Sequence, residues 1–373
     1  MRLSAVAVHY RTPELLAGSV EALRRDCDAA GLACQVVVVD NGSAREDRTL
    51  LRSAADLLLE PGENLGYAGG LNRGIREARA DRLLFFNPDV EVLPGCVPTL
   101  LEALDSAAVA GPRFYWERRR RLLLPPTERR TRLDEAIRRL APRSPRLVRL
   151  ARRRWRRHAR RHWLARAPFE SPWLSGALLA VRRDALERVG PFDEGFRLYF
   201  EETDWLLRLR AAGLRAVHVP PAEAVHLYDQ SAAGEPRSGA WFAESRCRFE
   251  ARHYGRAFTA LLRSLEPLTR VIRAEEPDPP EPAPADSSHP PALDLEVPAG
   301  AARPVWVEIS AGAPGFPAAA ELLEDPAGAV SWRLPAEVWE RLRPGVYRVR
   351  AVDAEGAEGP PACLVRPGSP PGR

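Results

Sequence analysis

Residues Leu3–Ser43 read LSAVAVHYRTPELLAGSVEALRRDCDAAGLACQVVVVDNGS and indicate a strand, a helix and a second strand in that order. The apolar runs LSAVAV and VVVV are continuous, which is typical of strands that are covered on both faces of a parallel sheet. The intervening helix is expected to begin at Pro13 and to end near Gly31. Two further apolar runs, LLL and LLFF, continue the alternation. We therefore predict an α/β fold with a doubly wound, mostly parallel sheet.

The rest of the chain divides by composition. Residues 113–170 form an arginine-rich insertion, which we expect to contain short basic helices and loops. After it, LSGALLAV reads as a strand, and helical patterns cover 201–212 and 241–273. The Pro-, Asp-, Glu- and Ser-rich residues 274–299 indicate a linker between an α/β domain at 1–273 and a small all-β, sandwich-like accessory domain at 300–373. In that last domain, VWVEIS and GVYRVRAV read as alternating strands.

Composition limits the function classes. The 373 residues carry a net charge of +5, and all 55 basic residues are arginine, which indicates a GC-rich coding bias and weakens any inference from arginine content to nucleic acid. The five cysteines show no zinc or disulfide spacing, which fits a reducing cytoplasm. No stretch approaches the roughly 20 apolar residues that span a bilayer, so we expect a soluble or peripheral protein.

Polar residues follow several of the predicted strands, at the sheet edge where open α/β proteins bind ligands. The first strand ends at His9 and Tyr10, and the second ends at DNGS, residues 40–43. The Asp40 carboxylate can accept hydrogen bonds from a ribose or a base, although a helix N-cap or turn would also suit it. A dinucleotide-binding reading fails because residues 9–13 contain no glycine of a G-x-G-x-x-G motif.

The stretch NLGYAGGLNRG, residues 64–74, has glycines that let backbone approach a ligand at a helix N-terminus, or let the helix pack tightly on the sheet. After LLFF comes Asn87-Pro88-Asp89, where a carboxylate could hold a hard cation or the motif could simply form a turn.

Three acids, Glu201, Glu202 and Asp204, cluster where a helix is expected to begin. One of them could take a proton from an attacking hydroxyl. The alternative is an acidic first turn that complements the helix dipole, with Asp204 and Arg208 paired one turn apart. His226 could join a carboxylate on a metal or serve a structural role.

Taken together and in this order, DNGS, NLGYAGGLNRG, NPDV, WLSGALLAVRRDAL and FDEGFRLYFEETDWLLRLRAAG resemble family 2 glycosyltransferases of the GT-A fold, and rhamnosyltransferase-like members in particular. The resemblance covers residues 3–256. It implies that Asp40 contacts the nucleoside, that Asp89 is the last residue of a D-x-D motif whose first position is Asn87 here, and that Glu202 is the catalytic base. Glu201 and Asp204 stay open as alternatives for the base, and His226 would face the metal and the diphosphate.

The resemblance also implies the reaction. An inverting, metal-dependent enzyme would transfer a sugar from a nucleotide-diphosphate donor, with dTDP-rhamnose as a candidate, to a glycan or lipid-linked acceptor in bacterial cell-surface polysaccharide assembly. The cofactor would be Mg²⁺ or Mn²⁺, at Asp89 and His226. The substrate-contacting residues that we predict are His9, Tyr10, Asp40, Asn41, Asn64, Gly66, Tyr67, Gly69, Asn72, Asn87, Trp173, Ser175, Gly176 and Arg208.

The insertion suggests further partners. From Arg113 to Arg166 there are 21 arginines against four acids, with Trp116, Trp155 and Trp163 interspersed. This segment could touch a phospholipid surface, with the tryptophans at the interface, or bind a polyprenyl diphosphate, or merely be solvated. We expect no nucleic acid, and a cytoplasmic location, peripheral at the inner face of the plasma membrane. The rival functions are a non-catalytic nucleotide-sugar or glycan-binding protein and an RNA-binding protein.

Overall fold

The structure is a computed structural model that describes residues 2–44, 46–141, 144–227, 237–269, 289–311, 316–324, 326 and 328–367, with backbone alone at 265–269. Contacts divide the chain into an α/β unit, Met1–Phe114 with Leu164–Thr259, and a β unit, Tyr115–Trp163 with Ala260–Arg373. Most of the predicted linker lies outside the described residues, although Ala292–Glu296 within it form a strand. The domain boundaries drawn from the sequence stay a prediction.

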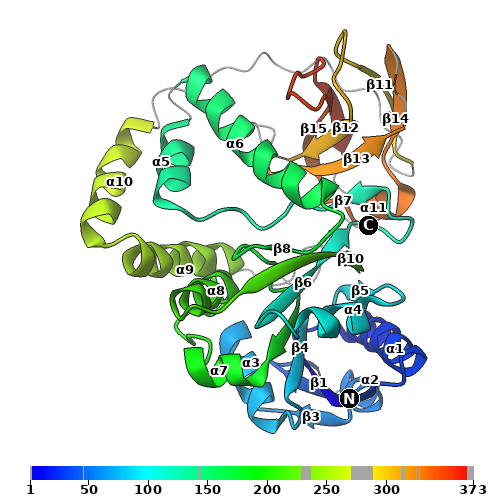
Figure 1. Cartoon of the computed structure of the whole chain (residues 1–373), viewed down its shortest axis with the longest axis vertical. Coiled ribbons are helices and arrows are strands. Elements are labelled where there is room, and N and C mark those ends of the chain that lie inside the picture. The colour runs from blue at the N-terminus through cyan, green and yellow to red at the C-terminus, as the bar shows by residue number, and fades with distance from the viewer. Residues whose placement is uncertain are drawn as a thin grey trace, which may run out of the picture. The chain divides into compact units, whose positions relative to one another are not determined.

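The α/β unit is built on a mixed sheet of strand order β6-β9-β4-β1-β2-β3 (Figure 1). Its strands are β1 (Arg2–His9), β2 (Ala33–Asp40), β3 (Leu57–Leu59), β4 (Arg82–Phe86), β6 (Val109–Tyr115) and β9 (Leu178–Arg182). β1 pairs parallel with β2 and β4, and β2 pairs parallel with β3. β9 runs antiparallel between β4 and β6, so β6 has the direction of the parallel strands. β10 (Ala216–His226) pairs antiparallel with β5 (Val90–Val92) and β8 (Phe169–Glu170).

Helices cover both faces of this sheet (Figure 1). One apolar cluster takes Ala5 and Ala7 of β1 together with residues of α1 (Pro13–Ala29), α2 (Arg48–Ala54) and α4 (Cys96–Ala103). The other takes Val6 and Val8 together with residues of α3 (Gly66–Glu77), α7 (Arg183–Val189) and α8 (Glu201–Ala211). Since successive side chains of a strand point to opposite faces, this alternation confirms the predicted doubly wound arrangement. α9 (Ser238–His253) and α10 (Arg256–Thr269) follow.

Two sequence expectations need correction here. The run LSGALLAV is a strand only from Leu178 onward, because Ser175–Ala177 form a turn that the site uses. The helical pattern predicted for 241–273 is two helices over its described part, 241–269, and they break at Gly255, which has a φ of 86° that only glycine adopts readily. Residues 270–273 lie outside the described residues.

Close packing of α3 on β1 gives the first testable prediction. A Cβ on Gly74 would lie 2.4 Å from Val6 Cγ1, whereas a Cβ on Gly18 of α1 would meet nothing within 4 Å. Gly74→Ala is therefore expected to lower the free energy of unfolding by about 1–3 kcal/mol through overpacking. The matched control, Gly18→Ala, should raise it by up to about 1 kcal/mol through helix propensity. Urea denaturation measures both, and equal effects would contradict the packing argument.

The β unit contains the small antiparallel sandwich that the sequence predicts. One sheet has the order β16-β15-β12-β13-β7, and the other pairs β11 with β14. The strands are β7 (Leu122–Leu123), β11 (Ala292–Glu296), β12 (Val305–Ser310), β13 (Ala319–Leu323), β14 (Ala329–Arg333), β15 (Gly345–Val352) and β16 (Ala362–Arg366). Leu295, Val307 and Trp332, from the two sheets, share one core with Trp339 of α11 (Ala336–Arg341).

The arginine-rich insertion contributes two helices to the β unit, α5 (Arg132–Leu140) and α6 (Pro145–Leu164). With 20 residues, α6 is longer than the short helices expected. Trp155 and Trp163 are 8% and 4% exposed, so the expectation that these tryptophans lie at a membrane interface is wrong. They pack edge to face with ring centroids 5.7 Å apart.

Candidate active site

His9 and Asp40 meet at the carboxyl ends of β1 and β2, where the parallel register pairs them directly. His9 Nε2 accepts the Thr12 N–H at 2.9 Å, so the ring proton is on Nδ1. Nδ1 lies 3.0 Å from Ser43 Oγ, and the Ser43 hydroxyl donates to Asp40 Oδ1 at 2.7 Å. Burial raises the pKa of Asp40, but the hydrogen bonds from His9 and Ser43 outweigh it and leave the pKa below its ordinary value. Asp40 is therefore an anionic acceptor at the sheet edge.

The loop that leads into α3 is fixed by side chains that we predicted to contact substrate. Asn41 Nδ2 donates to the Gly66 carbonyl at 2.9 Å, and Asn64 Oδ1 accepts the Gly66 N–H at 2.8 Å. Gly66 has a φ of 73°, and a Cβ there would lie 2.6 Å from the Arg197 carbonyl oxygen. The Tyr67 N–H donates to that same oxygen at 2.7 Å. Gly66 thus allows this loop to approach the segment before α8.

Asn72 and Arg208, both predicted to bind substrate, form hydrogen bonds that brace the segment 189–194. Asn72 Nδ2 donates to the Phe192 carbonyl at 2.9 Å, and Asn72 Oδ1 accepts the Phe192 N–H at 3.1 Å. Arg208 donates to the Val189 and Pro191 carbonyls and to Asp204 Oδ2. A Cβ on Gly69 would lie 3.1 Å from Leu65 Cβ, so this glycine serves packing within the helix.

The Asn87–Asp89 turn brings oxygen and nitrogen donors together. The antiparallel pairing of β5 with β10 places His226 opposite Val90. His226 Nε2 therefore lies 3.4 Å from the buried Asp89 Oδ1. Asn87 Oδ1 is buried, and no described residue hydrogen-bonds to it. Carboxylate and amide oxygens suit a hard divalent cation whose remaining positions go to water and substrate phosphates. Within the described ranges, no group of three or more His, Cys, Asp or Glu side chains is arranged to hold a metal.

The segment Ser175–Ala177 joins this turn to the acidic start of α8. The Asn87 N–H donates to the Ala177 carbonyl at 2.9 Å, and the Tyr67 hydroxyl donates to the Gly176 carbonyl at 3.3 Å. A Cβ on Gly176 would lie only 3.0 Å from Glu202 Cγ, so Glu202 lies directly against the Gly176 backbone. The Asn87–Asp89 turn and the start of α8 therefore both lie against the segment Ser175–Ala177.

Tyr67 gives independent support for that convergence. Its pKa is raised, first by burial and then by the negative charges of Glu201, Glu202 and Asp89. These carboxylates lie far apart in the sequence but act on one phenol.

The three acids of α8 have different environments. Glu201 is buried, and both burial and the neighbouring charge of Glu202 raise its pKa. Asp204 is fully buried beside Arg208, Arg252 and His253; burial raises its pKa, but these partners outweigh it and bring it to about 2. Glu202 is half-buried, and its Oε1 accepts the Thr203 hydroxyl at 3.3 Å.

Two bulky residues immediately before α8 adopt left-handed backbone, Tyr199 with a φ of 69° and Phe200 with a φ of 70°. Such conformations cost about 1–3 kcal/mol each and persist at functional sites where the surroundings impose them. Here they set the direction in which the acidic first turn emerges.

Three other residues, Trp173, Ser175 and Tyr10, were predicted to contact the substrate. Trp173 and Ser175 are half-buried, and Ser175 Oγ accepts the Ala177 N–H at 3.3 Å. Tyr10 is half-buried, with the Arg11 guanidinium 4.8 Å from its ring centre. Their substrate roles stay predictions.

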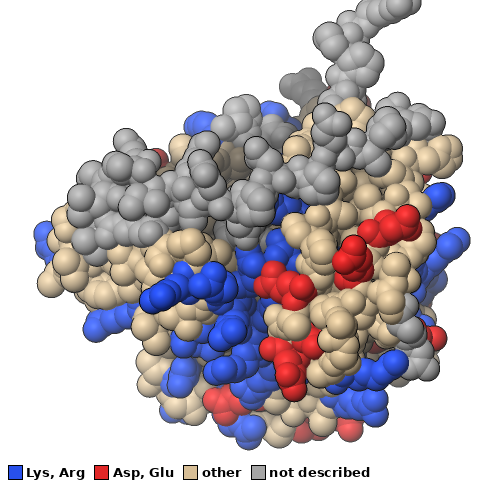
Figure 2. Space-filling model, turned by 90° about the horizontal axis from the view of Figure 1, so that it is seen from above, with Lys and Arg blue, Asp and Glu red and all other residues tan. Residues whose placement is uncertain are grey.

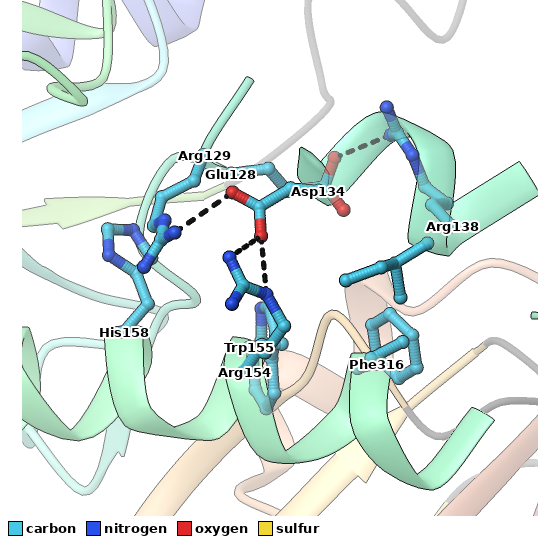
Figure 3. A pocket seen from close by; sticks show the side chains of 10 residues that line it. Glu128, Arg129, Asp134, Arg138, Arg154, Trp155, His158 and Phe316 are labelled. Atoms are coloured by element: carbon cyan, nitrogen blue, oxygen red, sulfur yellow. Dashed lines mark hydrogen bonds and ion pairs between the residues drawn. The ribbon is translucent and has the colours of Figure 1, made fainter. Parts of the chain in front are cut away.

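A separate pocket lies in the β unit, between α5 and α6 (Figure 3). It is a cavity of about 50 Å³, which has room for a few waters. Its Asp134 accepts hydrogen bonds from Arg129 and Arg154, and Glu128 pairs with Arg138. Both carboxylates are therefore neutralised by arginines within the β unit.

Comparisons with known proteins show what this chain is similar to. Residues 4–190 match the family model for glycosyl transferase family 2, a range that includes Asp40, Asp89 and Gly176 and stops before α8. The chain is 32% identical over 231 residues to the N-acetylglucosaminyl-diphospho-decaprenol L-rhamnosyltransferase of Mycobacterium tuberculosis, which covers 54% of this chain and 69% of that one. It is 33% identical over 81 residues to rhamnosyltransferase WbbL of Escherichia coli, covering 21% and 31%.

Among solved structures, the mannosyltransferase PcManGT of Pyrobaculum calidifontis is 16% identical to this chain, with a TM-score of 0.45 and 72% and 71% of the two chains covered.

Proposed function

The chain belongs to glycosyl transferase family 2, and on that premise we propose that it transfers a sugar from a nucleotide-diphosphate donor to an acceptor hydroxyl with inversion at the anomeric carbon. One observation carries the proposal. The Asn87–Asp89 turn and the Glu202 side chain both contact the segment Ser175–Ala177, so a donor diphosphate at the first would hold its sugar near the second.

We assign the base to Glu202. Burial and the adjacent charge of Glu202 raise the pKa of Glu201 well above its ordinary value, which favours the protonated carboxyl over the form that could accept a proton. Asp204 is committed to hydrogen bonds from His253, Arg252 and Arg208, which hold its pKa at about 2 and make it a poor base. Glu202 is half-buried and follows the left-handed Phe200 by two positions. Its carboxylate accepts the proton of the acceptor hydroxyl as that oxygen attacks the anomeric carbon and the nucleoside diphosphate leaves.

The donor end is the Asp40 edge of the sheet. The lowered pKa of Asp40 keeps it anionic, so it can accept hydrogen bonds from a ribose or base. Since two relatives are named as rhamnosyltransferases, dTDP-rhamnose is the donor to test first. The name of the mycobacterial relative suggests a polyprenyl-diphosphate-linked N-acetylglucosamine as acceptor, and hence a role in cell-surface polysaccharide assembly.

Mg²⁺ or Mn²⁺ fits the donor set at the turn. Asp89 and His226 would hold the cation, and the Asn87 amide oxygen of the same turn is buried without a hydrogen bond from a described residue. Such a cation, when bound, stabilises the negative charge that grows on the departing diphosphate. The chain's own contribution is to fix these side chains by backbone hydrogen bonds, from Asn87 to Ala177 and from Leu227 to Asp89.

Asp89→Asn tests the metal proposal. It should raise the metal concentration for half-maximal, dTDP-dependent thermal stabilisation by about 10- to 100-fold, because an amide is a weaker and uncharged ligand. Differential scanning fluorimetry with Mn²⁺ and dTDP provides the readout. The exposed Asp105→Asn is the matched control and should leave the midpoint unchanged; an unchanged midpoint for Asp89→Asn would remove Asp89 from the site.

The function itself is tested by incubating the full chain with Mn²⁺, dTDP-rhamnose and a lipid-diphosphate-linked N-acetylglucosamine. We expect release of dTDP and a product whose anomeric configuration, read by NMR, is opposite to that of the donor. Donor binding without turnover for any nucleotide sugar would instead favour the non-catalytic binding protein. The described part of the chain contains no helix long and apolar enough to cross a membrane, and we propose a peripheral location at the inner face of the plasma membrane.

A further inference from the structure

Helix α6 has a charge composition unlike the rest of the chain. Its 20 residues, PRLVRLARRRWRRHARRHWL, contain nine arginines and no acid. The whole chain has 55 basic and 50 acidic residues, so acids outnumber arginines outside this helix. A coding bias that favours arginine over lysine does not remove Asp and Glu. The absence of acids from α6 therefore needs a physical reason.

The arginines on the inner side of α6 are neutralised within the β unit. Arg156 pairs with Glu308 at 2.7 Å and Arg152 pairs with Glu358 at 2.8 Å. Arg154 pairs with Asp134 at 2.8 Å, as Figure 3 shows. Arg152 and Arg156 are buried, so this face of the helix belongs to the fold.

The outer arginines form a row that the fold does not neutralise. The row consists of Arg146, Arg149, Arg153 and Arg157, all exposed and spaced three or four positions apart. Such spacing places them on one side of the helix over about 16 Å. No acidic side chain of the described residues pairs with any of the four. Basic side chains gather into a broad patch in the view from above (Figure 2).

Arginines at the surface of other helices show the contrast. Arg25 pairs with Glu21, and Arg73 pairs with Glu77, each one helical turn away and at 2.6 Å. Beside the row lies Leu150, which is 43% exposed. Four arginines on one helix face without an acidic partner among the described residues form the kind of basic cluster that anionic lipid headgroups attract, and the exposed leucine adds one apolar side chain to that face.

We propose that the arginine row of α6 docks the enzyme on a bilayer containing anionic phospholipids, with Leu150 reaching the headgroup region. The inference rests on the proposed function in one respect: docking would hold the enzyme at the membrane in which its lipid-linked acceptor is embedded. Each arginine near an anionic bilayer strengthens binding about fivefold. The tryptophans of α6 are buried, so this face offers none of the aromatic platforms on which single-stranded nucleic acid stacks.

Vesicle flotation of the full chain tests the proposal, with phosphatidylcholine vesicles with and without phosphatidylglycerol. The unaltered chain is expected to bind only the anionic vesicles. The triple variant R149Q/R153Q/R157Q should lose about 100-fold in partition coefficient at low salt. The control R25Q/R52Q/R76Q removes the same charge from exposed arginines of α1, α2 and α3 and should change binding by no more than about twofold.

Equal losses in the two triple variants, or equal binding to neutral vesicles, would overturn the docking surface. So would tighter, salt-sensitive binding of the row to RNA than to anionic vesicles. Circular dichroism melting checks that both variants fold. Transfer to a short-chain, water-soluble acceptor should be the same in the row variant and the unaltered chain, so a failure of docking is distinguishable from a failure of the transferase assignment.

Discussion

Glu202→Gln is expected to lower kcat by about 100- to 10,000-fold, the range that a positioned general base contributes. Glutamine has the same shape, so it keeps the contact with Gly176 but cannot accept the acceptor's proton. Donor binding should therefore persist. Initial rates of dTDP release give kcat, and isothermal titration with dTDP in the presence of Mn²⁺ gives the affinity, which we expect to be unchanged within about twofold.

The matched variant Glu201→Gln separates the two adjacent acids. Because burial and the Glu202 charge raise the pKa of Glu201 and so favour its neutral carboxyl, we expect an amide at this position to preserve most of the activity. The exposed Glu187→Gln controls for a general loss of negative charge. If Glu201→Gln removes turnover while Glu202→Gln keeps it, the base is Glu201 and our assignment is wrong.

The sheet of the α/β unit could be predicted from local pattern. Continuous apolar runs predicted β1, β3 and β4 almost to their ends, because burial on both faces leaves few polar positions in such strands. The run VVVV covered the centre of β2 and missed its first three residues, which include Gln35. The strand that carries His226 was missed. β10 contains Pro220 and Pro221, which remove two backbone donors and ordinarily indicate a strand edge or a break.

The site residues that could be predicted from the sequence are the acidic residues that stand at or just after the end of a strand. Asp40 and Asp89 both lie there, and the resemblance added Glu202. The sequence could not distinguish residues that brace the backbone around the site from residues that would contact the substrate. Asn72 braces Phe192, which is 120 positions away, and no local spacing reveals that pairing. The sequence also left Glu201, Glu202 and Asp204 equivalent, because their environments come from residues elsewhere in the chain.

Arg252 and His253 show this most clearly, since neither was singled out from the sequence. They lie at the end of α9, and both contact Asp204 Oδ1, Arg252 at 2.9 Å and His253 at 2.8 Å. Asp204 is thus an anchor that ties α9 to the acidic first turn of α8. An anchor in this position acts on Glu202 through the helix, as a positioning residue.

Asp204→Asn is accordingly expected to lower the free energy of unfolding by about 3 kcal/mol at pH 7. Removing one member of a buried ion pair typically costs 3–5 kcal/mol, and the lower end applies because Arg208, Arg252 and His253 are partly exposed to screening water. Urea denaturation measures the loss. The exposed pair Asp184 with Arg182 supplies the control, and Asp184→Asn should change stability by less than about 1 kcal/mol.

We also predict how the effect of Asp204→Asn on the free energy of unfolding changes with pH. The partners lower the pKa of Asp204 from 3.8 to about 2, so the folded state binds this proton less readily than the unfolded state. The stabilisation from Asp204 is therefore complete above about pH 4 and falls as the pH drops toward 2. The difference in unfolding free energy between the unaltered chain and Asp204→Asn should shrink by about 2 kcal/mol over that window. A difference that stayed constant from pH 7 to pH 2.5 would show that Asp204 is not held as an anion by these cations, and the reason for excluding it as the base would disappear with it.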